Sequence, residues 1–162
     1  MNSQQDERAF IRQAIDLAVE NATVGQLPFG ALVVRDGDIL ATGVNSELRD
    51  HDPIAHAEVD AVRKACRELR TLALPGAVLV SSCEPCALCH ATAAFAGISR
   101  VVYAAPKELA AAWLGGPEDR STSLLTDMQR ALRCLAPEQI VHVATDGDSR
   151  PFERFATARP RP

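Results

Sequence analysis

The sequence contains no run of about 20 consecutive apolar residues, and this absence excludes a membrane-spanning helix. It also lacks an excess of basic charge, since 21 acidic residues outnumber 17 basic ones and the formal net charge is -4. We therefore expect no broad basic surface for nucleic acid. The stretch from Met1 to Arg8 is polar, so no signal peptide is predicted and the expected location is the cytoplasm. Internal repeats and low-complexity segments are absent as well.

Five cysteines, an odd number, are present. In a chain without an export signal they are better explained as metal ligands or buried thiols than as a disulfide framework. Cys66 and Cys134 have helical apolar neighbours and are expected in the core. A chain of 162 residues buries roughly 70% of the surface that its unfolded form exposes, so its core needs no covalent staples. We predict a single domain over residues 1–157 and a frayed tail over 158–162.

Helical and strand patterns alternate along the chain and predict an α/β protein. Asp36-Gly37, between two apolar runs, is a strong hairpin signal, and residues 45–53 are polar and turn-like. A helix joins the strands predicted at 77–82 and 100–104, so these strands are expected to be parallel with a right-handed connection. Overall we predict helices at 6–24, 54–69, 86–96, 107–114, 124–135 and 151–157, on both faces of a five-stranded mixed sheet formed by 29–35, 39–44, 77–82, 100–104 and 140–144.

His56, Glu58, Cys86 and Cys89 form the pattern around which the rest of the chain is organised. Zinc in catalytic sites takes three nitrogen or sulfur ligands from the protein and keeps one position open. Cys86 and Cys89 stand three residues apart, which places both sulfurs on one side of the first turn of a helix. His56 opens the preceding helix, so two helix N-termini can point at one ion. Glu58 reaches the same site only if His56 lies in an irregular first turn.

Two other metal arrangements would use the same cysteines. Cys83 also forms a Cys-x-x-Cys with Cys86, but Pro85 is best placed at the start of the helix, which leaves Cys83 at the end of a strand. The segment Cys86-Ala87-Leu88-Cys89-His90 matches the attachment signature of a c-type haem. Haem attachment needs export and leaves His56 without a role, so we favour one zinc ion held by the three ligands above.

Four stretches carry a family resemblance: Pro28-Phe29-Gly30-Ala31, Asn45, Ala55-His56-Ala57-Glu58-Val59 and Ser82-Cys83-Glu84-Pro85-Cys86-Ala87-Leu88-Cys89. The last two contain the His-x-Glu and Pro-Cys-x-x-Cys signature of zinc deaminases. Over about residues 6–105 the chain resembles the cytidine deaminase-like superfamily, and within it the chain is most similar to the bacterial guanine deaminases. These motifs are highly specific for zinc-dependent deamination and much less specific for the base.

The resemblance implies a three-layer α/β/α sandwich with a central five-stranded mixed sheet, and a homodimer with the two sites near its interface. It implies one zinc ion per chain and a small-molecule nucleobase as the substrate, most closely guanine, which would be converted to xanthine and ammonia. The residues that it assigns are His56, Cys86 and Cys89 as zinc ligands, Glu58 as the catalytic proton-transfer group, and Asn45, Phe29 and the backbone amide of Ala57 as substrate contacts.

The resemblance is weakest where the family closes its site, with an acidic residue after the fourth strand and an aromatic C-terminal segment. Glu118 or Asp119 would supply that carboxylate at a different spacing, Pro151 to Phe155 resembles the closing helix, and residues 158–162 do not match. Other free bases or nucleosides, such as cytosine, the s-triazine ammeline or guanosine, therefore stay open as substrates. Adenosine in tRNA also stays open, although the net charge of -4 disfavours it. A structural zinc module is the non-enzymatic alternative, against which Glu58 argues.

Overall fold

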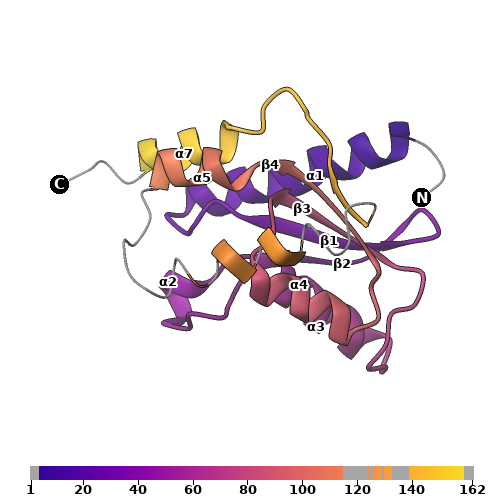
Figure 1. Cartoon of the computed structure of the whole chain (residues 1–162). Helices are drawn as coiled ribbons and strands as arrows, with labels where there is room; N and C mark the ends of the chain where they lie inside the picture. Colours follow the sequence, from indigo (N-terminus) through magenta and orange to yellow (C-terminus); the bar gives the residue numbers. More distant parts are fainter. Residues whose placement is uncertain (1–3, 115–123, 125, 129, 133–138, 159–162) are drawn as a thin grey trace.

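A five-stranded mixed sheet forms the centre of the protein, and helices cover both of its faces (Figure 1). The computed structural model describes residues 4–114, 124, 126–128, 130–132 and 139–158. Its strands are β1 Gly30–Arg35, β2 Asp38–Val44, β3 Val78–Cys83, β4 Arg100–Ala105 and β5 Ile140–His142, in the order β2-β1-β3-β4-β5. Its helices are α1 Gln4–Thr23, α2 Glu47–Asp50, α3 Ala57–Glu68, α4 Ala87–Phe95, α5 Lys107–Leu114 and α7 Arg150–Ala158.

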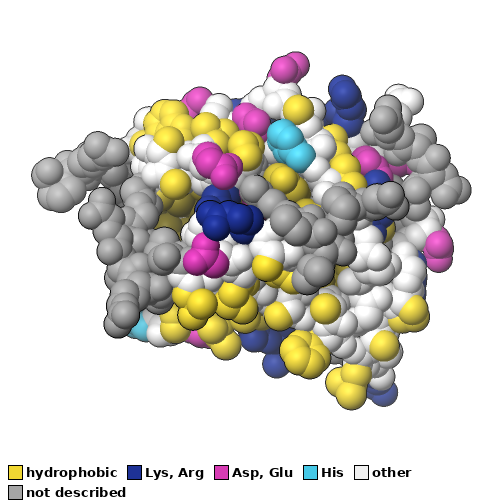
Figure 2. Space-filling model, viewed as in Figure 1, with side chains coloured by type: hydrophobic (Ala, Val, Ile, Leu, Met, Phe, Trp, Pro, Cys, Tyr) yellow, Lys and Arg dark blue, Asp and Glu magenta, His cyan; other side chains and the backbone are white. Residues whose placement is uncertain are grey.

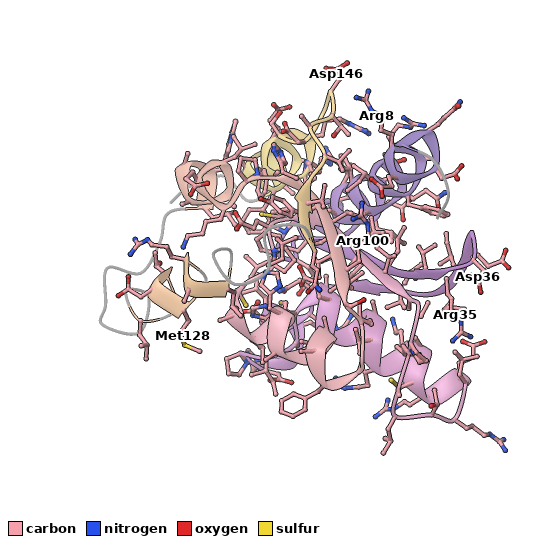
Figure 3. All side chains as sticks on the ribbon, turned by 45° about the vertical axis from the view of Figure 1, so that its right-hand side comes forward. Arg8, Arg35, Asp36, Arg100, Met128 and Asp146 are labelled. Carbon is pink, nitrogen blue, oxygen red and sulfur yellow. The ribbon has the colours of Figure 1, made fainter. Side chains whose placement is uncertain are left out.

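The sheet combines an antiparallel half with a parallel half. β1 pairs antiparallel with both β2 and β3, whereas β3 with β4 and β4 with β5 pair in parallel. The turn between β1 and β2 uses Asp36 and Gly37, whose φ angles of 55° and 90° are those of a tight hairpin turn. Figure 3 shows Asp36 at the tip of this hairpin, on the opposite side of the molecule from Met128. The predicted hairpin and the predicted parallel pair across α4 are both confirmed.

The two faces of the sheet bury separate apolar clusters, because successive side chains of a strand point to opposite faces. Ala31 and Val33 of β1 join the cluster that contains apolar residues of α3 and α4. Leu32 and Val34 join the cluster that contains apolar residues of α1. Figure 1 shows α1, α5 and α7 on one side of the sheet and α3 and α4 on the other. This three-layer α/β/α arrangement is the predicted fold class.

Close packing of α3 on β2 fixes where α3 begins. Gly43 of β2 has no side chain, and a β-carbon there would collide with the backbone carbonyl of Ala57 and the backbone amide of Ala61. Because both partners are backbone atoms, any larger residue at this position would push the helix away from the sheet. The first turn of α3, and therefore the position of His56, depends on this glycine.

The segment that leads into α3 differs from the prediction. Residues 45–53, predicted as a turn, contain the one-turn helix α2, and the helix predicted from Ile54 begins only at Ala57. The reason lies in Asp52, whose Oδ1 accepts a hydrogen bond from the backbone N–H of Ile54 at 3.0 Å and so favours a turn over a helix. His56 is consequently extended, with φ -74° and ψ 152°.

Beyond β4 the described residues follow the predicted order of helix, helix, strand and helix. The helices α5 and α7 and the strand β5 lie where they were predicted, within one to two residues. Residues 124, 126–128 and 130–132 are helical, inside the helix predicted at 124–135. Residues 115–123, which include Glu118 and Asp119, lie outside the described residues, as does Cys134. Among the described helices, none is long and apolar enough to cross a membrane.

Candidate active site

Two helices that pack against each other under the sheet, α3 and α4, bring the metal-binding groups together (Figure 1). His56 immediately precedes α3, Cys86 immediately precedes α4, and both residues are extended rather than helical. Cys89 lies in the first turn of α4. The Nδ1 atom of His56 lies 3.6 Å from Sγ of Cys86 and 3.4 Å from Sγ of Cys89, and the two sulfurs are 3.6 Å apart. Of the described residues, these three are positioned to bind one metal ion.

The spacing of these three atoms fits a tetrahedral zinc ion. With Zn–S bonds of about 2.3 Å and a Zn–N bond of about 2.0 Å, the edges of such a tetrahedron measure roughly 3.5 to 3.8 Å. The observed separations of 3.4 to 3.6 Å are close to these values. Two sulfurs and one imidazole nitrogen are also ligands that zinc prefers, and three is the number of protein ligands in catalytic zinc sites. The predicted ligand set therefore suits one zinc ion per chain.

Hydrogen bonds inside the cluster prepare Cys86 to bind a metal. A hydrogen bond from Cys89, together with one from His56, lowers the pKa of Cys86 to about 4 against the opposing effect of burial. The hydrogen bond with Cys86 and burial raise the pKa of Cys89 well above its ordinary value. The pKa of His56 is raised to about 9, chiefly by its hydrogen bond with Cys86. Because zinc binds thiolates and neutral imidazole, its binding displaces the protons of Cys89 and His56.

Glu58 places a buried carboxylate beside the three ligands. Its Oε1 accepts a hydrogen bond from the hydroxyl of Ser81 on β3 at 2.7 Å, and its Oε2 accepts one from the thiol of Cys89 at 3.2 Å. The side chain is only 6% exposed, and burial raises the pKa of its carboxyl group. The geometry thus meets the condition set by the sequence, because the extended His56 and the first turn of α3 bring Glu58 to the same side.

A cavity of about 200 Å³ opens beside this cluster. Phe29 forms one wall, and its ring packs edge-to-face against Phe152 of α7, with centroids 6.0 Å apart and planes at 71°. The volume is below the roughly 300 Å³ at which pockets for drug-sized ligands begin, so the cavity suits one small ring system. The lining residues are Phe29, Asn45, Glu47, His56, Glu58, Cys83, Glu84, Cys86, Cys89, Lys107 and Ala110.

The predicted substrate contacts divide into two groups. Asn45 and Phe29 line the cavity, whereas Ala57 does not appear among its described lining residues and is buried in the core cluster under β1. Asn45 is 1% exposed, and its backbone carbonyl accepts a hydrogen bond from the side-chain amide of Asn21 at 2.8 Å. Asn45 is therefore fixed in place at the cavity rather than part of a free loop.

Cys83 lies where the sequence placed it, at the end of β3. It is buried in a small cluster with Ala105 and Phe152, and burial raises the pKa of its thiol. The group of described residues positioned to bind the metal includes Cys89 but not Cys83, so the position of its sulfur sets Cys83 apart from the ligands.

Sequence reasoning missed three charged lining residues, Glu47, Glu84 and Lys107. Glu84 and Lys107 follow the carboxyl ends of the parallel strands β3 and β4, and the backbone N–H of Lys107 donates to the carboxylate of Glu84 at 3.3 Å. Ligand sites of open α/β sheets lie outside these strand ends, so this rule would have found both. Glu47 offered no comparable signal, because it belongs to the helix α2 that the sequence did not predict.

The profile of one protein family matches most of the chain. The family is described as the cytidine and deoxycytidylate deaminase zinc-binding region, and the match covers residues 4–105. That range includes the three metal-binding residues and Glu58, and it ends at the last residue of β4.

Two relatives and one solved structure show how far the similarity extends. The chain is 44% identical over 102 residues to a guanine deaminase of Bacillus subtilis (strain 168), covering 62% of this chain and 65% of that protein. It is 35% identical over 99 residues to a tRNA-specific adenosine deaminase of Buchnera aphidicola subsp. Baizongia pistaciae, covering 61% of each. In these sequence alignments the chain thus spans less than two thirds of the length of either relative. The X-ray structure of guanine deaminase from Bacillus subtilis superimposes with a TM-score of 0.60 at 28% identity, over 96% of both chains.

Proposed function

The chain belongs to the cytidine and deoxycytidylate deaminase zinc-binding family, and from this membership and the geometry above we propose that it hydrolyses the amino group of guanine, giving xanthine and ammonia. One observation carries the proposal. A buried carboxylate, Glu58, lies within 3.2 Å of a metal ligand, Cys89, at a cavity large enough for a single base.

The three ligands His56, Cys86 and Cys89 hold zinc in this proposal. Zinc bound there would act as a Lewis acid that lowers the pKa of water to about 7, so that hydroxide would be available as the nucleophile at neutral pH. The protein's own part is the movement of protons. Glu58 accepts a proton from the attacking water and returns it to a ring nitrogen, and then passes the second proton to the departing amine. A carbon–oxygen bond forms, the carbon–nitrogen bond breaks, and ammonia leaves with no net change in oxidation state.

The surroundings of Glu58 suit a group that both accepts and returns protons. Burial raises the pKa of its carboxyl group, which moves it toward neutral pH, where proton transfer in both directions is efficient. The hydroxyl of Ser81, 2.7 Å from Oε1, keeps the carboxylate oriented through both transfers.

The walls of the cavity support a planar base as the substrate. Phe29 offers an aromatic surface for a ring, and Asn45 offers a polar amide at its edge. The volume of about 200 Å³ leaves little room for an attached ribose. The Bacillus subtilis relative, named as a guanine deaminase, supports guanine among the free bases.

Adenosine in tRNA is the second candidate substrate, because several relatives at 35–41% identity are named as tRNA-specific adenosine deaminases. An RNA substrate would require cationic contacts to phosphates, and its binding would weaken steeply with salt. A neutral free base would need no cationic contacts, and its binding would not weaken steeply with salt. The net charge of -4 favours the free base.

A survey of ammonia release by the zinc-loaded protein tests the proposal. Guanine, cytosine, adenine, ammeline, the corresponding nucleosides and a tRNA anticodon arm are the substrates, and Glu58→Gln is the matched inactive control. We expect guanine to give the highest kcat/KM. Higher kcat/KM on the anticodon arm would replace guanine with tRNA, and no release from any substrate by zinc-loaded protein would overturn the proposal.

A homodimer is part of the same proposal. Phe95 at the end of α4 is 91% exposed, and Leu72 in the loop after α3 is equally exposed. Figure 2 shows apolar side chains along the lower part of the molecule, where α3 and α4 lie in Figure 1. A second copy of the chain would cover this surface, and apolar patches on a soluble protein commonly mark such contacts. Light scattering should give twice the mass of the chain.

A further inference from the structure

One carboxylate oxygen connects the metal site to the wall of the cavity. Oε1 of Glu47 lies 3.5 Å from Nε2 of His56, and it accepts a hydrogen bond from the side-chain Nδ2 of Asn45. The backbone N–H of Glu47 in turn donates to Oδ1 of Asn45 at 3.1 Å. Glu47 therefore contacts a residue that binds the metal and a residue that lines the substrate cavity.

The contact with His56 bears on how that ring binds the metal. A neutral imidazole carries one proton, and only the nitrogen without the proton can bind a metal ion. In this structure Nδ1 faces the two cysteine sulfurs at 3.4 and 3.6 Å, while Nε2 faces Glu47. A carboxylate next to Nε2 stabilises a proton there and so leaves Nδ1 free for zinc.

The contact with Asn45 bears on how its amide faces the cavity. An amide side chain has two N–H donors on Nδ2 and two acceptor positions on Oδ1. The carboxylate of Glu47 accepts a hydrogen bond from one donor of Nδ2, and the backbone N–H of Glu47 donates to one acceptor position of Oδ1. Together these two bonds fix the orientation of the amide of Asn45. One donor and one acceptor position remain for the edge of a base.

We propose that Glu47 is a positioning residue that holds His56 with Nδ1 toward the zinc and fixes the amide of Asn45 toward the substrate. The first role depends only on the metal site. The second role rests on the proposed function, since it concerns the base that Asn45 would contact. Glu47 acts through these two neighbours and takes no part in proton transfer.

Zinc affinity, measured by competition with a chromophoric chelator in the absence of substrate, tests the first role. We expect Glu47→Ala to weaken zinc binding about 10- to 100-fold, the range found when the partner of a metal-binding histidine is removed. Glu47→Gln should retain most of the affinity, because its amide oxygen can still accept a hydrogen bond from the N–H group at Nε2. Equal losses in the two variants would overturn an orienting role, since only the charge would then matter. A zinc affinity of Glu47→Ala within about twofold of wild type would overturn the proposal.

Asp50 provides the matched control. It is an acidic residue of the same short helix, but it pairs with Arg49 on the surface and is not among the described residues that line the cavity. Asp50→Ala should leave zinc affinity within about twofold of wild type. A loss equal to that of Glu47→Ala would show that α2 as a whole, rather than Glu47, supports the site, and it would overturn the proposal.

Nitrogen-15 NMR of the zinc-loaded wild-type protein reads the state of His56 directly and needs no variant. We expect Nδ1 to be the metal-bound nitrogen and Nε2 to carry a proton that exchanges slowly with water. Zinc bound through Nε2 would overturn the proposal. In zinc-saturated Glu47→Ala, which loses the acceptor for Asn45, KM for the best substrate should rise more than kcat falls, whereas Glu47→Gln, which keeps an oxygen there, should stay close to wild type. An unchanged KM in zinc-saturated Glu47→Ala would overturn the second role.

Discussion

The metal-binding side of the cavity and the wall opposite it are built in different ways. His56 and Cys86 immediately precede α3 and α4, and each helix start is held against the sheet or against the other helix. The opposite wall comes from Lys107 and Ala110 of α5, with Phe152 of α7 behind Phe29. The first side lies within residues 4–105, which match the family, and α5 and α7 lie beyond them.

This difference assigns separate tasks to the two sides. Ligand atoms within 3.6 Å of each other tolerate little displacement, and they provide the chemistry that any amino-substituted ring would need. Under the proposed function, we expect the opposite wall to contact the part of the ring that differs from one base to another. Substitutions on the metal side should therefore abolish turnover on every substrate, whereas substitutions on the wall should change KM and the preference among substrates.

Glu58→Gln should have the largest effect on turnover. The amide cannot accept the proton of water, so kcat should fall by roughly 10⁴-fold, near the upper limit for one acid–base group. Zinc content, measured by atomic absorption, should equal that of wild type, because Glu58 is not one of the metal-binding residues. Turnover near the wild-type rate in zinc-loaded Glu58→Gln would show that another group moves the protons.

Cys86→Ser should remove the metal, whereas Cys83→Ser should keep it. A serine hydroxyl is a poor zinc ligand, and Cys86 is the cysteine whose pKa is lowered to about 4. Cys83 is buried beside Phe152, so serine there should lower the free energy of unfolding by about 1 to 3 kcal/mol through the burial of a hydroxyl group. Zinc content and urea unfolding measure the two effects. Loss of zinc in Cys83→Ser, with the fold intact, would place Cys83 in the metal site.

The metal side could be predicted from the sequence because its chemistry depends on residue type and short spacing. Cys86 and Cys89 lie three apart at the start of one helix, which brings both sulfurs to one side. His56 and Glu58 lie two apart and share the site because His56 is extended just before α3, which is the condition stated from the sequence. The β1–β2 hairpin was predicted from Asp36-Gly37, and the parallel pairing of β3 with β4 was predicted from the helix that joins them. The order of the strands and the pairing of β5 came from the structure alone.

The wall could not be predicted in the same way, because its contacts join distant parts of the chain. Phe152 packs against Phe29, although the two are more than a hundred residues apart in the sequence. No local pattern in either segment indicates this contact. Glu47 reached the cavity through a one-turn helix that begins after the turn residue Asn45, where sequence patterns favour a loop. Glu84 and Lys107 were predictable only from the general position of sites at the ends of parallel strands.

Phe152→Leu tests the wall without touching the metal side. Leucine preserves most of the apolar volume but loses the edge-to-face contact with Phe29, which is worth about 0.5 to 1.5 kcal/mol. We expect KM for guanine to rise roughly two- to tenfold, in line with that energy, while kcat and zinc content stay close to wild type. Phe10→Leu, a buried phenylalanine in the cluster under α1, is the control and should lower stability without changing KM. An equal KM change in both variants would attribute the effect to general loosening of the fold.

Lys107→Met should change KM for a neutral base by about as much as Phe152→Leu does, and it is the variant most informative about substrate charge. Lys107 is the one cation of the Lys or Arg type among the described residues that line the cavity, and its Nζ donates to the hydroxyl of Thr126 at 2.9 Å. A free base offers this ammonium group only uncharged hydrogen-bond acceptors, such as O6 and N7 of guanine. Removing the group should therefore raise KM about tenfold, the lower end of the range for hydrogen bonds to a charged group. A phosphate-bearing substrate would form charge-assisted hydrogen bonds with the same group, and its KM should rise more steeply and depend on salt. Steady-state kinetics of Lys107→Met with guanine and with guanosine monophosphate, at low and at high salt, separate the two cases. If the variant loses only a nucleotide activity, the wall selects an anion, and the free base is not the substrate for which this side of the cavity is built.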